Sequence, residues 1–136
     1  MLVVEEKLFT TLSGGTALTA LLGGTEIYNA LGNRGSVNTY PMVIFTKSSG
    51  VDDNDSPHRA KTLVYQVTGI SMVSKYQAET IDNACDALIH NASLGSMVGW
   101  GDYWCRRETD ISYVEEIAGG KVLWHEGGMY RIRLAV

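Results

Sequence analysis

Three groups of residues in this 136-residue sequence carry side chains that could do chemistry. The first is an acidic segment with Asp52, Asp53 and Asp55, whose carboxylates resemble the alternating ligands of a calcium loop. A loop of the EF-hand type also needs a glycine at its sixth position and a glutamate at its twelfth. Counted from Asp53, the sixth residue is His58, and the distal glutamate is missing as well. The segment is therefore predicted to be a solvated loop and not a metal site.

The second group consists of the histidines and cysteines, which are scattered. His58, His90 and His125 are isolated from one another, and Cys85 and Cys105 form no CxxC unit or zinc-type cluster. His90 falls at the end of a predicted helix, where a cationic imidazole would complement the helix dipole. Nucleophilic catalysis needs a serine or cysteine with a base and a third, orienting group. The sequence presents no such set, so we expect no catalytic residue, no metal and no cofactor.

The two cysteines are expected to be free thiols in a reducing compartment, in preference to a disulfide. Cys85 falls on the apolar stripe of a predicted helix. Cys105 lies between Trp104 and Arg106, and such a neighbourhood could lower the pKa of its thiol. A thiol packed in a strand is the favoured interpretation.

The third group is aromatic and comprises Trp100, Tyr103 and Trp104. Such residues can anchor a protein interface, stack on a ligand, or fill the core and edge of a strand. The sequence favours an interface role and a core role equally. A small enzyme or ligand-binding module would combine this cluster with His125 and Glu126. That module is the alternative from a different functional class.

Composition excludes several other classes of protein. The chain has 11 basic and 15 acidic residues and a formal charge of -4, with no run of lysine or arginine. General affinity for nucleic acid needs clustered basic residues, so it is not expected. No segment approaches the roughly 20 apolar residues that cross a bilayer. The N-terminal residues lack the basic flank and apolar stretch of a secretory signal.

The elements that must position these residues follow from periodicity. Helical spacing over residues 3–12 places Val4, Leu8, Phe9 and Leu12 together, and the following glycines end that helix. Thr16 is expected to cap a short second helix. The remaining expectations in this half are a short strand at 27–31, a loop at 32–39, a strand at 42–46 and a long flexible loop at 48–59.

The second half of the sequence has stronger signals. A strand is predicted at 60–72, followed by a helix at 75–91 that Ser74 and Gln77 begin as a capping box. Two further strands are predicted at 101–117, with a bend or bulge, and at 122–134, joined by a two-residue turn at Gly119 and Gly120. Hairpin-joined strands with helices gathered on one face predict a single α+β domain, with a mostly antiparallel sheet spanning residues 1–136.

Several motifs along nearly the whole chain resemble the small tail-completion, or tail-terminator, proteins of long-tailed phages. The resemblance rests on the segment ALTALLGG to IYNAL at 17–31 and on Tyr40-Pro41 leading into Val43, Ile44 and Phe45. It continues through the long strand and alanine-rich helix at 63–91. It ends with Gly128, Tyr130-Arg131 and an alternating strand. The region from 99 to 126 is longer than in that pattern.

This resemblance implies a structural virion protein, made in the cytoplasm of a bacterial host, that is not an enzyme. Its partners would be further copies of itself in a ring, typically a hexamer, the tail tube protein, and the connector at the neck of the head. DNA would pass through the lumen of the ring without sequence-specific contact. Another neck or tail-tube component is the alternative within this class. The expected interface residues are Asn33, Arg34, Asp52, Asp53, Asp55, Arg59, Trp100, Tyr103 and Trp104.

Overall fold

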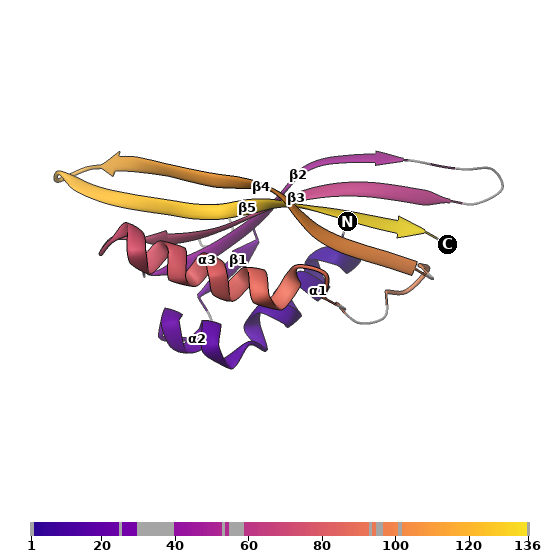
Figure 1. Cartoon of the computed structure of the whole chain (residues 1–136), viewed down its shortest axis with the longest axis horizontal. Coiled ribbons are helices and arrows are strands. Elements are labelled where there is room, and N and C mark those ends of the chain that lie inside the picture. The colour runs from indigo at the N-terminus through magenta and orange to yellow at the C-terminus, as the bar shows by residue number, and fades with distance from the viewer. Residues whose placement is uncertain are drawn as a thin grey trace.

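The computed structural model of the protein is an α+β fold in which three helices cover one face of a five-stranded sheet (Figure 1). It describes residues 2–24, 26–29, 40–52, 54, 59–92, 94, 97–100 and 102–135. The strand order is β1-β2-β3-β5-β4, and all neighbours are antiparallel except β1 and β2. The predicted fold class is confirmed. The predicted loop at 32–39, with Asn33 and Arg34, lies outside the described residues, as do Asp53, Asp55 and His58.

The N-terminal half of the chain supplies two helices and a short strand. Helix α1 (Leu2–Ser13) buries Val4, Leu8 and Leu12 against the core. Phe9 was expected to join them but is 41% exposed, because it lies beside that stripe and not on it. Helix α2 (Thr16–Leu22) begins at an N-cap residue, Gly15, without a side-chain cap, so Thr16 is its first residue and not its cap. Strand β1 (Ile27–Asn29) follows.

Strand β2 is longer than the sequence pattern predicts, whereas its neighbour β3 agrees with the strand predicted at 60–72 to within one residue. Strand β2 (Met42–Asp52) pairs with β3 (Ala60–Ser71) from Met42↔Ile70 to Asp52↔Lys61, with a register shift between Lys47 and Ser49. The prediction of a flexible loop starting at Ser48 was therefore wrong. Backbone pairing with β3 holds this polar segment extended, although no apolar alternation marks it as a strand.

Helix α3 (Lys75–Ile89) lies flat on the sheet, as predicted. The Ser74 hydroxyl accepts a hydrogen bond from the backbone N–H of Gln77 at 3.1 Å. The Gln77 side chain does not complete the predicted capping box, because its amide oxygen accepts from the Ser71 hydroxyl. Ser71 itself accepts from the N–H groups of Val73 and Ser74, at 3.0 and 3.3 Å. The helix start is therefore fastened to the end of β3.

Strands β4 (Asp102–Ile117) and β5 (Lys121–Ala135) form a long hairpin along one edge of the sheet. The predicted irregularity is a register shift between Arg107 and Thr109. The turn has three residues, 118–120, where two were predicted, since Ile117 pairs with Lys121. Gly119 and Gly120 both have positive φ, 84° and 71°, which glycine adopts without steric cost.

The two faces of the sheet have different surroundings. Successive side chains of a strand point to opposite faces, and one face packs against the helices in the main core. This core includes Tyr65, Val67, Tyr130 and Ile132 together with Ile81 of α3. On the other face a smaller apolar cluster gathers Met42, Ile44, Ile70 and Leu123. We call this second face the open face, because the three helices all lie on the opposite side. None of the helices in the described part is long and apolar enough to cross a membrane.

Candidate functional site

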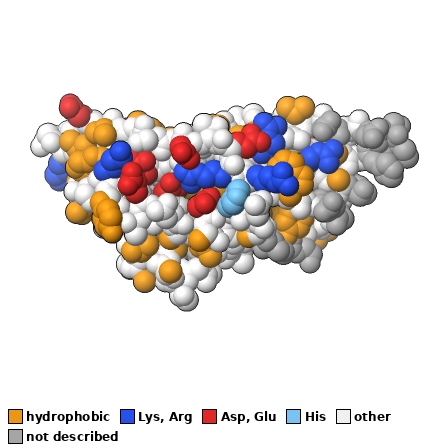
Figure 2. Space-filling view, in the orientation of Figure 1, with side chains coloured by type: hydrophobic (Ala, Val, Ile, Leu, Met, Phe, Trp, Pro, Cys, Tyr) orange, Lys and Arg blue, Asp and Glu red, His pale blue; other side chains and the backbone are white. Residues whose placement is uncertain are grey.

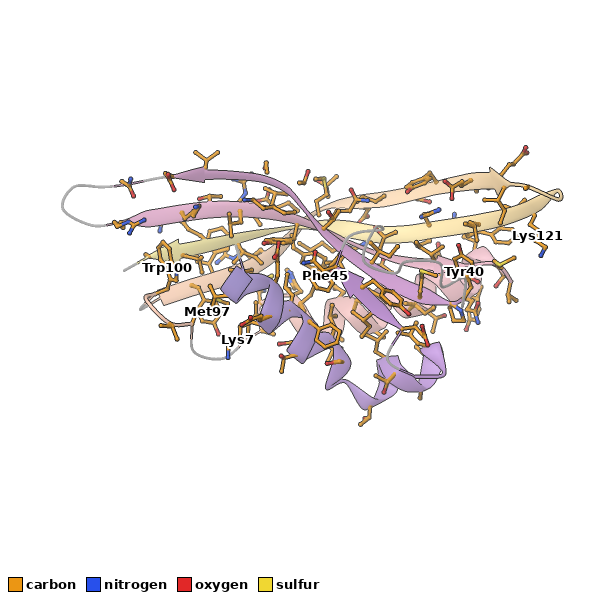
Figure 3. All side chains as sticks on the ribbon, turned by 180° about the vertical axis from the view of Figure 1, so that it is seen from behind. Lys7, Tyr40, Phe45, Met97, Trp100 and Lys121 are labelled. Carbon is orange, nitrogen blue, oxygen red and sulfur yellow. The ribbon has the colours of Figure 1, made fainter. Side chains whose placement is uncertain are left out.

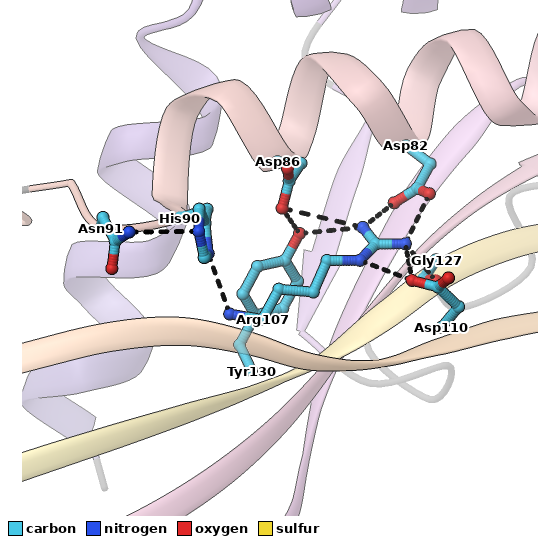
Figure 4. Close-up of polar contacts among 8 residues, drawn as sticks. All are labelled: Asp82, Asp86, His90, Asn91, Arg107, Asp110, Gly127 and Tyr130. Carbon is cyan, nitrogen blue, oxygen red and sulfur yellow. Dashed lines mark hydrogen bonds and ion pairs between the residues drawn. The ribbon is translucent and has the colours of Figure 1, made fainter.

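A group of connected polar side chains is centred on Arg107, which lies beside the irregularity in β4 (Figure 4). Its guanidinium donates two parallel hydrogen bonds to Asp82 of α3, at 2.7 and 2.9 Å, and a third to the carbonyl of Gly127 at 2.8 Å. Further contacts reach Asp110 at 3.0 Å and the Tyr130 hydroxyl at 3.2 Å. The hydrogen bonds to Asp82 hold the pKa of the guanidinium above its ordinary range, while partial burial opposes this shift. Arg107 therefore remains a cation and ties α3 to β4 and β5.

The carboxylates of this cluster come from one side of α3. Asp82 and Asp86 are four residues apart, which places them on the same side of a helix. Asp82 is only 8% exposed and is neutralised by Arg107, whereas Asp86 accepts from the Tyr130 hydroxyl at 2.8 Å. Burial raises the pKa of Tyr130, so that the phenol stays protonated and donates. Arg107, Asp82, Tyr130 and Asp86 are therefore joined in one network of hydrogen bonds.

Two consecutive glycines make room for this cluster. A Cβ on Gly128 would lie 2.7 Å from Cζ of Arg107, and a Cβ on Gly127 would lie 2.1 Å from the carbonyl oxygen of Val67 in β3. The pair was noted in the sequence as a tight feature, but it does not interrupt β5. It lets the backbone of β5 approach both the guanidinium and the neighbouring strand.

The C-terminus of α3 covers part of the outer edge of β4. The Arg107 N–H donates to Nδ1 of His90 at 3.0 Å, and the Asn91 N–H donates to the carbonyl of Cys105 at 2.8 Å. His90 thus satisfies a backbone donor at a sheet edge, and its expected role as a cation on the helix dipole stays a prediction.

A groove of about 510 Å³ lies on the open face, and we call it the open-face groove. Its apolar lining includes Ile44, Ile70 and Leu123, and the His125 ring stacks on Tyr113 with centroids 4.3 Å apart. The His125 Nε2 lies 3.3 Å from Oε1 of Glu115. The residues that line it are Tyr40, Ile44, Thr46, Gln66, Thr68, Ile70, Tyr113, Glu115, Ile117, Leu123 and His125. The groove therefore has an apolar floor and a polar margin, and it is suited to an apolar group.

The predicted aromatic cluster is divided between two faces of the sheet. Trp100 and Tyr103 are partly buried against the main core. Trp104 points to the opposite face, where Cζ of Arg106 lies 4.9 Å from the ring centroid. Of the two interpretations, core packing fits the first pair, whereas Trp104 is half-buried on the other face.

The ligand-binding alternative needs residues that the structure separates. Trp104 pairs with Arg133, whereas His125 pairs with Tyr113, nine residues further along β4. At about 3.3 Å per residue this is a separation of roughly 30 Å. Glu126 points to the helix side and accepts from the Ser112 hydroxyl at 2.6 Å, away from the open-face groove. The aromatic cluster, His125 and Glu126 therefore form no common pocket.

The other predicted interface residues that the structure describes lie on the β2–β3 hairpin. Asp52 ends β2 and its carboxylate lies 3.6 Å from Nζ of Lys61, and both Asp52 and Arg59 are exposed.

Cys85 and Cys105 are free, buried thiols, as expected. Burial raises the pKa of Cys105 to about 12, which excludes the activated thiolate that its neighbours suggested. Among the residues described here, no group of histidine, cysteine, aspartate and glutamate has the arrangement of a metal site.

Comparison with known proteins shows likeness in fold alone. No family model and no curated protein matches the sequence. One solved structure with a similar fold is a chain of the virion of a native gene transfer agent (GTA) particle, with a TM-score of 0.72. The two chains are 16% identical in sequence, and the similarity covers 95% of this chain and 92% of that one. Nearly the full length of this fold therefore has a counterpart in that chain.

Proposed function

We propose that the protein is a structural component of a phage or phage-like virion, and that within it the chain acts as a tail terminator. Copies of the chain would form a ring through non-covalent surface contacts, and this ring would close the end of the completed tail tube and meet the neck of the head. The observation that carries the proposal is the likeness in fold to a chain of the GTA virion over nearly the full length of both. The motifs that resemble tail-completion proteins agree with it.

The site chemistry supports an assembly role. The Arg107 cluster uses its charged groups on one another, and the described surface instead offers an uncovered sheet face and two long hairpins. Such features bind other protein surfaces rather than turn over a substrate. The acidic segment from Asp52 to Asp55 would line the lumen of the ring, where like charge keeps DNA from adhering. A ring structure with this segment on the outer rim would contradict the assignment to the lumen.

Electron microscopy of tail tubes mixed with the purified protein tests this function. We expect a ring at one end of each tube and no further growth of the capped end. An acidic globular protein of the same size is the control for adventitious adhesion. Bare tube ends together with a persistent monomer would contradict the proposal.

The same experiment separates the terminator from the alternative of a tail-tube or other neck protein. A tube protein would polymerise by itself into long tubes, whereas a terminator would stop at a ring. A neck protein of another kind would bind the head connector and leave tube ends open.

A further inference from the structure

The sheet has two edge segments whose outer sides are uncovered in the part of the chain that the structure describes. Strand β1 pairs only with residues 43–45 of β2, so residues 46–52 lie beyond it. At the other edge, the end of α3 covers residues 105–107 of β4 through two hydrogen bonds, and residues 109–117 lie beyond that cover. We call residues 46–52 the β2 edge and residues 109–117 the β4 edge.

Exposed apolar side chains mark both of these edges. Val51 of the β2 edge is 63% exposed, and Tyr113 and Val114 of the β4 edge are 46% and 58% exposed. Figure 2 shows hydrophobic side chains among charged ones at the end of the molecule where the β4–β5 hairpin closes. An exposed edge strand with apolar side chains is a template on which another strand pairs. The two edges are therefore surfaces suited to a further strand.

The direction of the backbone groups along each edge follows from contacts already described. The Val43 N–H donates away from β3, to the segment before β1, and the Arg107 N–H donates away from β5, to α3. This direction alternates along a strand, and each strand has one extra residue at its register shift, 48 in β2 and 108 in β4. The residues whose backbone groups point outward are therefore Lys47, Gly50 and Asp52 on the β2 edge, and Asp110, Ser112, Val114 and Glu116 on the β4 edge.

The strand order brings these edges together between copies and not within one copy. Strands β2 and β4 run in opposite directions, because each of the three pairings between them is antiparallel. A second copy in the same orientation therefore places its β4 edge antiparallel to the β2 edge, with both open faces on one side. Figure 3 shows Lys121, next to the end of β4, at one end of the molecule, whereas the β2–β3 hairpin extends to the other end.

Charge selects one register for this pairing. With Lys47 opposite Glu116, a cation meets an anion on the helix side of the sheet, where both side chains point. A shift by two residues in one direction places Asp52 opposite Asp110, and these like charges repel. A shift by two in the other direction moves Lys47 past the end of β4 at Ile117. A shift by one residue turns the side chains of the two strands to opposite faces.

The same register covers the exposed apolar side chains of both edges. Val51 and Tyr113 then face each other on the open side as a non-hydrogen-bonded pair, the kind in which side chains are closest. An aromatic side chain opposite a β-branched one stabilises a pair of strands. Val114 lies opposite Gly50, where the absence of a side chain leaves room for it. A single contact therefore covers three exposed apolar residues.

Charge on the open face beside the β2 edge has the sign that guides this contact. The β4 edge carries three acidic residues and no basic one, a net charge of -3. On the open face Arg131 of β5 lies two strands from the β2 edge, with Arg106 and Arg133 next to it on the same face. Glu108 neutralises Arg131, so this group has a net charge of +2. Glu115 of the incoming β4 edge points to the same face and is attracted by it.

We propose that the β4 edge of one copy pairs with the β2 edge of a second copy, so that the sheet continues from copy to copy. The contact is heterologous, since each copy gives one edge to each neighbour, and repetition closes a ring or extends a filament. Tyr113 is level with Met42 across the sheet, nine residues from Val51, so neighbours are displaced along the strands by roughly 30 Å. A ring built in this way has strands tilted to its axis, as in a closed barrel. This inference rests on the proposed ring and specifies which surfaces form it.

Charge reversal tests the register. Lys47→Glu and Glu116→Lys should each raise the midpoint concentration of self-association roughly tenfold, measured by analytical ultracentrifugation. An equimolar mixture of the two variants should associate as the wild type does, because copies of the two kinds alternate and every contact again joins a lysine to a glutamate. Recovery in the mixture also shows that both variants are folded. Lys75→Glu is the matched control, because Lys75 is an exposed lysine of α3, and it should leave the midpoint unchanged.

A disulfide cross-link tests the geometry of the same contact. A chain with Val51→Cys and Tyr113→Cys places two thiols opposite each other between copies, with Cα atoms about 4.5 Å apart, which a disulfide can bridge. Mild oxidation should give a ladder of linked copies on a non-reducing gel. The control chain carries Val51→Cys and Thr109→Cys, whose thiols lie four residues out of register, roughly 13 Å. It should remain unlinked, and the buried Cys85 and Cys105 are common to both chains.

The outcomes separate this inference from the proposed function. If the wild-type chain forms rings, both charge variants associate equally well and the cysteine pair does not link, the inference is overturned and the ring remains. If each charge variant is weakened but their mixture does not recover, the two residues do not meet, which also overturns the inference. If the wild-type chain stays monomeric and ignores tube ends, the proposed function is overturned together with it.

Discussion

Arg107 joins the helical layer of this molecule to its sheet through hydrogen bonds to Asp82 and to the Gly127 carbonyl. Its side chain is 18% exposed, and its guanidinium donates hydrogen bonds to a buried carboxylate, a backbone carbonyl and a phenol at the same time. A buried charged pair adds little stability compared with apolar packing, but removal of one partner is costly because the other stays buried and unpaired.

Arg107→Met should lower the free energy of unfolding by about 3 kcal/mol, because Asp82 then lacks the cation that neutralises it. Urea denaturation followed by circular dichroism measures this change. Arg131→Ala is the control, since Arg131 forms its ion pair with Glu108 in solvent, and it should change little. If Asp82→Asn restores much of the loss in the Arg107→Met background, the buried carboxylate is the cause. Failure to restore it would contradict this account.

Gly127→Ala should destabilise the fold by about 2 kcal/mol, because its Cβ would overlap the Val67 carbonyl, which is fixed in the sheet. Gly128→Ala should cost less, because its Cβ meets the end of the Arg107 side chain. Thermal unfolding of the two variants compares them. In the Arg107→Met background the cost of Gly128→Ala should largely disappear. Equal costs in both backgrounds would show that the guanidinium is not the obstacle.

The buried thiol of Cys105 predicts a loss of stability in base. Its pKa rises from 9.0 to about 12 on folding, so the folded state holds the proton more tightly than the unfolded chain does. The thiol therefore contributes to the free energy of unfolding in full below pH 9, and this contribution is lost as the pH rises toward 12. Burial raises the pKa of Tyr65 and Tyr130 as well, which acts in the same direction. Urea midpoints at pH 8 to 11 should therefore fall, and the fall should be smaller in Cys105→Ala.

The sequence analysis did not predict the hydrogen-bonded cluster around Arg107. The missed signal was the spacing of Asp82 and Asp86 on one side of a predicted helix, together with an arginine beside a predicted irregularity in β4. Sequence reasoning cannot pair such residues, because Asp82 and Arg107 are 25 positions apart and meet only through the packing of α3 on the sheet.

At the scale of elements, patterns with strong local causes were predicted well. Helix α3 has a capping serine and a regular apolar stripe, and it was placed to within two residues of its observed end. Strand β2 was predicted too short, because residues 48–52 have no apolar alternation and are extended only through pairing with β3. The hairpin turn was predicted one residue too short, since two glycines alone do not fix the register of the strands beside them.

The beginning of α3 gives a prediction at this scale. Ser71→Ala should lower the free energy of unfolding by about 2 kcal/mol, because two backbone N–H groups and the Gln77 amide lose their partner in a buried position. Ser74→Ala should cost about 1 kcal/mol, the usual value of an N-cap. Urea denaturation of both variants gives the comparison. A larger loss for Ser74→Ala would mean that the local cap, and not the fastening to β3, sets the start of the helix.

At the scale of the whole molecule, Arg106, Arg131 and Arg133 lie on one face of the β4–β5 hairpin, so the proposed association of copies should be sensitive to salt. If opposite charges orient neighbouring copies, raising the salt from 50 to 500 mM should increase the midpoint concentration of association several-fold, because salt shortens the range of the attraction. Sedimentation at several salt concentrations measures the effect. The Arg106→Glu variant should bind more weakly than the wild type at low salt and show a smaller dependence on salt. Salt-independent association of the wild type would leave apolar contact as the sole source of affinity.

The long β4–β5 hairpin also has a mechanical consequence. Its strands run along the length of the molecule, and their hydrogen bonds lie across that direction from Asp102↔Ala135 to Ile117↔Lys121. A pull along the length loads all these bonds at once in shear, whereas a pull that spreads the strands at one end breaks them one after another. The molecule should therefore resist stretching along its length far better than peeling, and single-molecule force measurements with the two attachment geometries would show the difference.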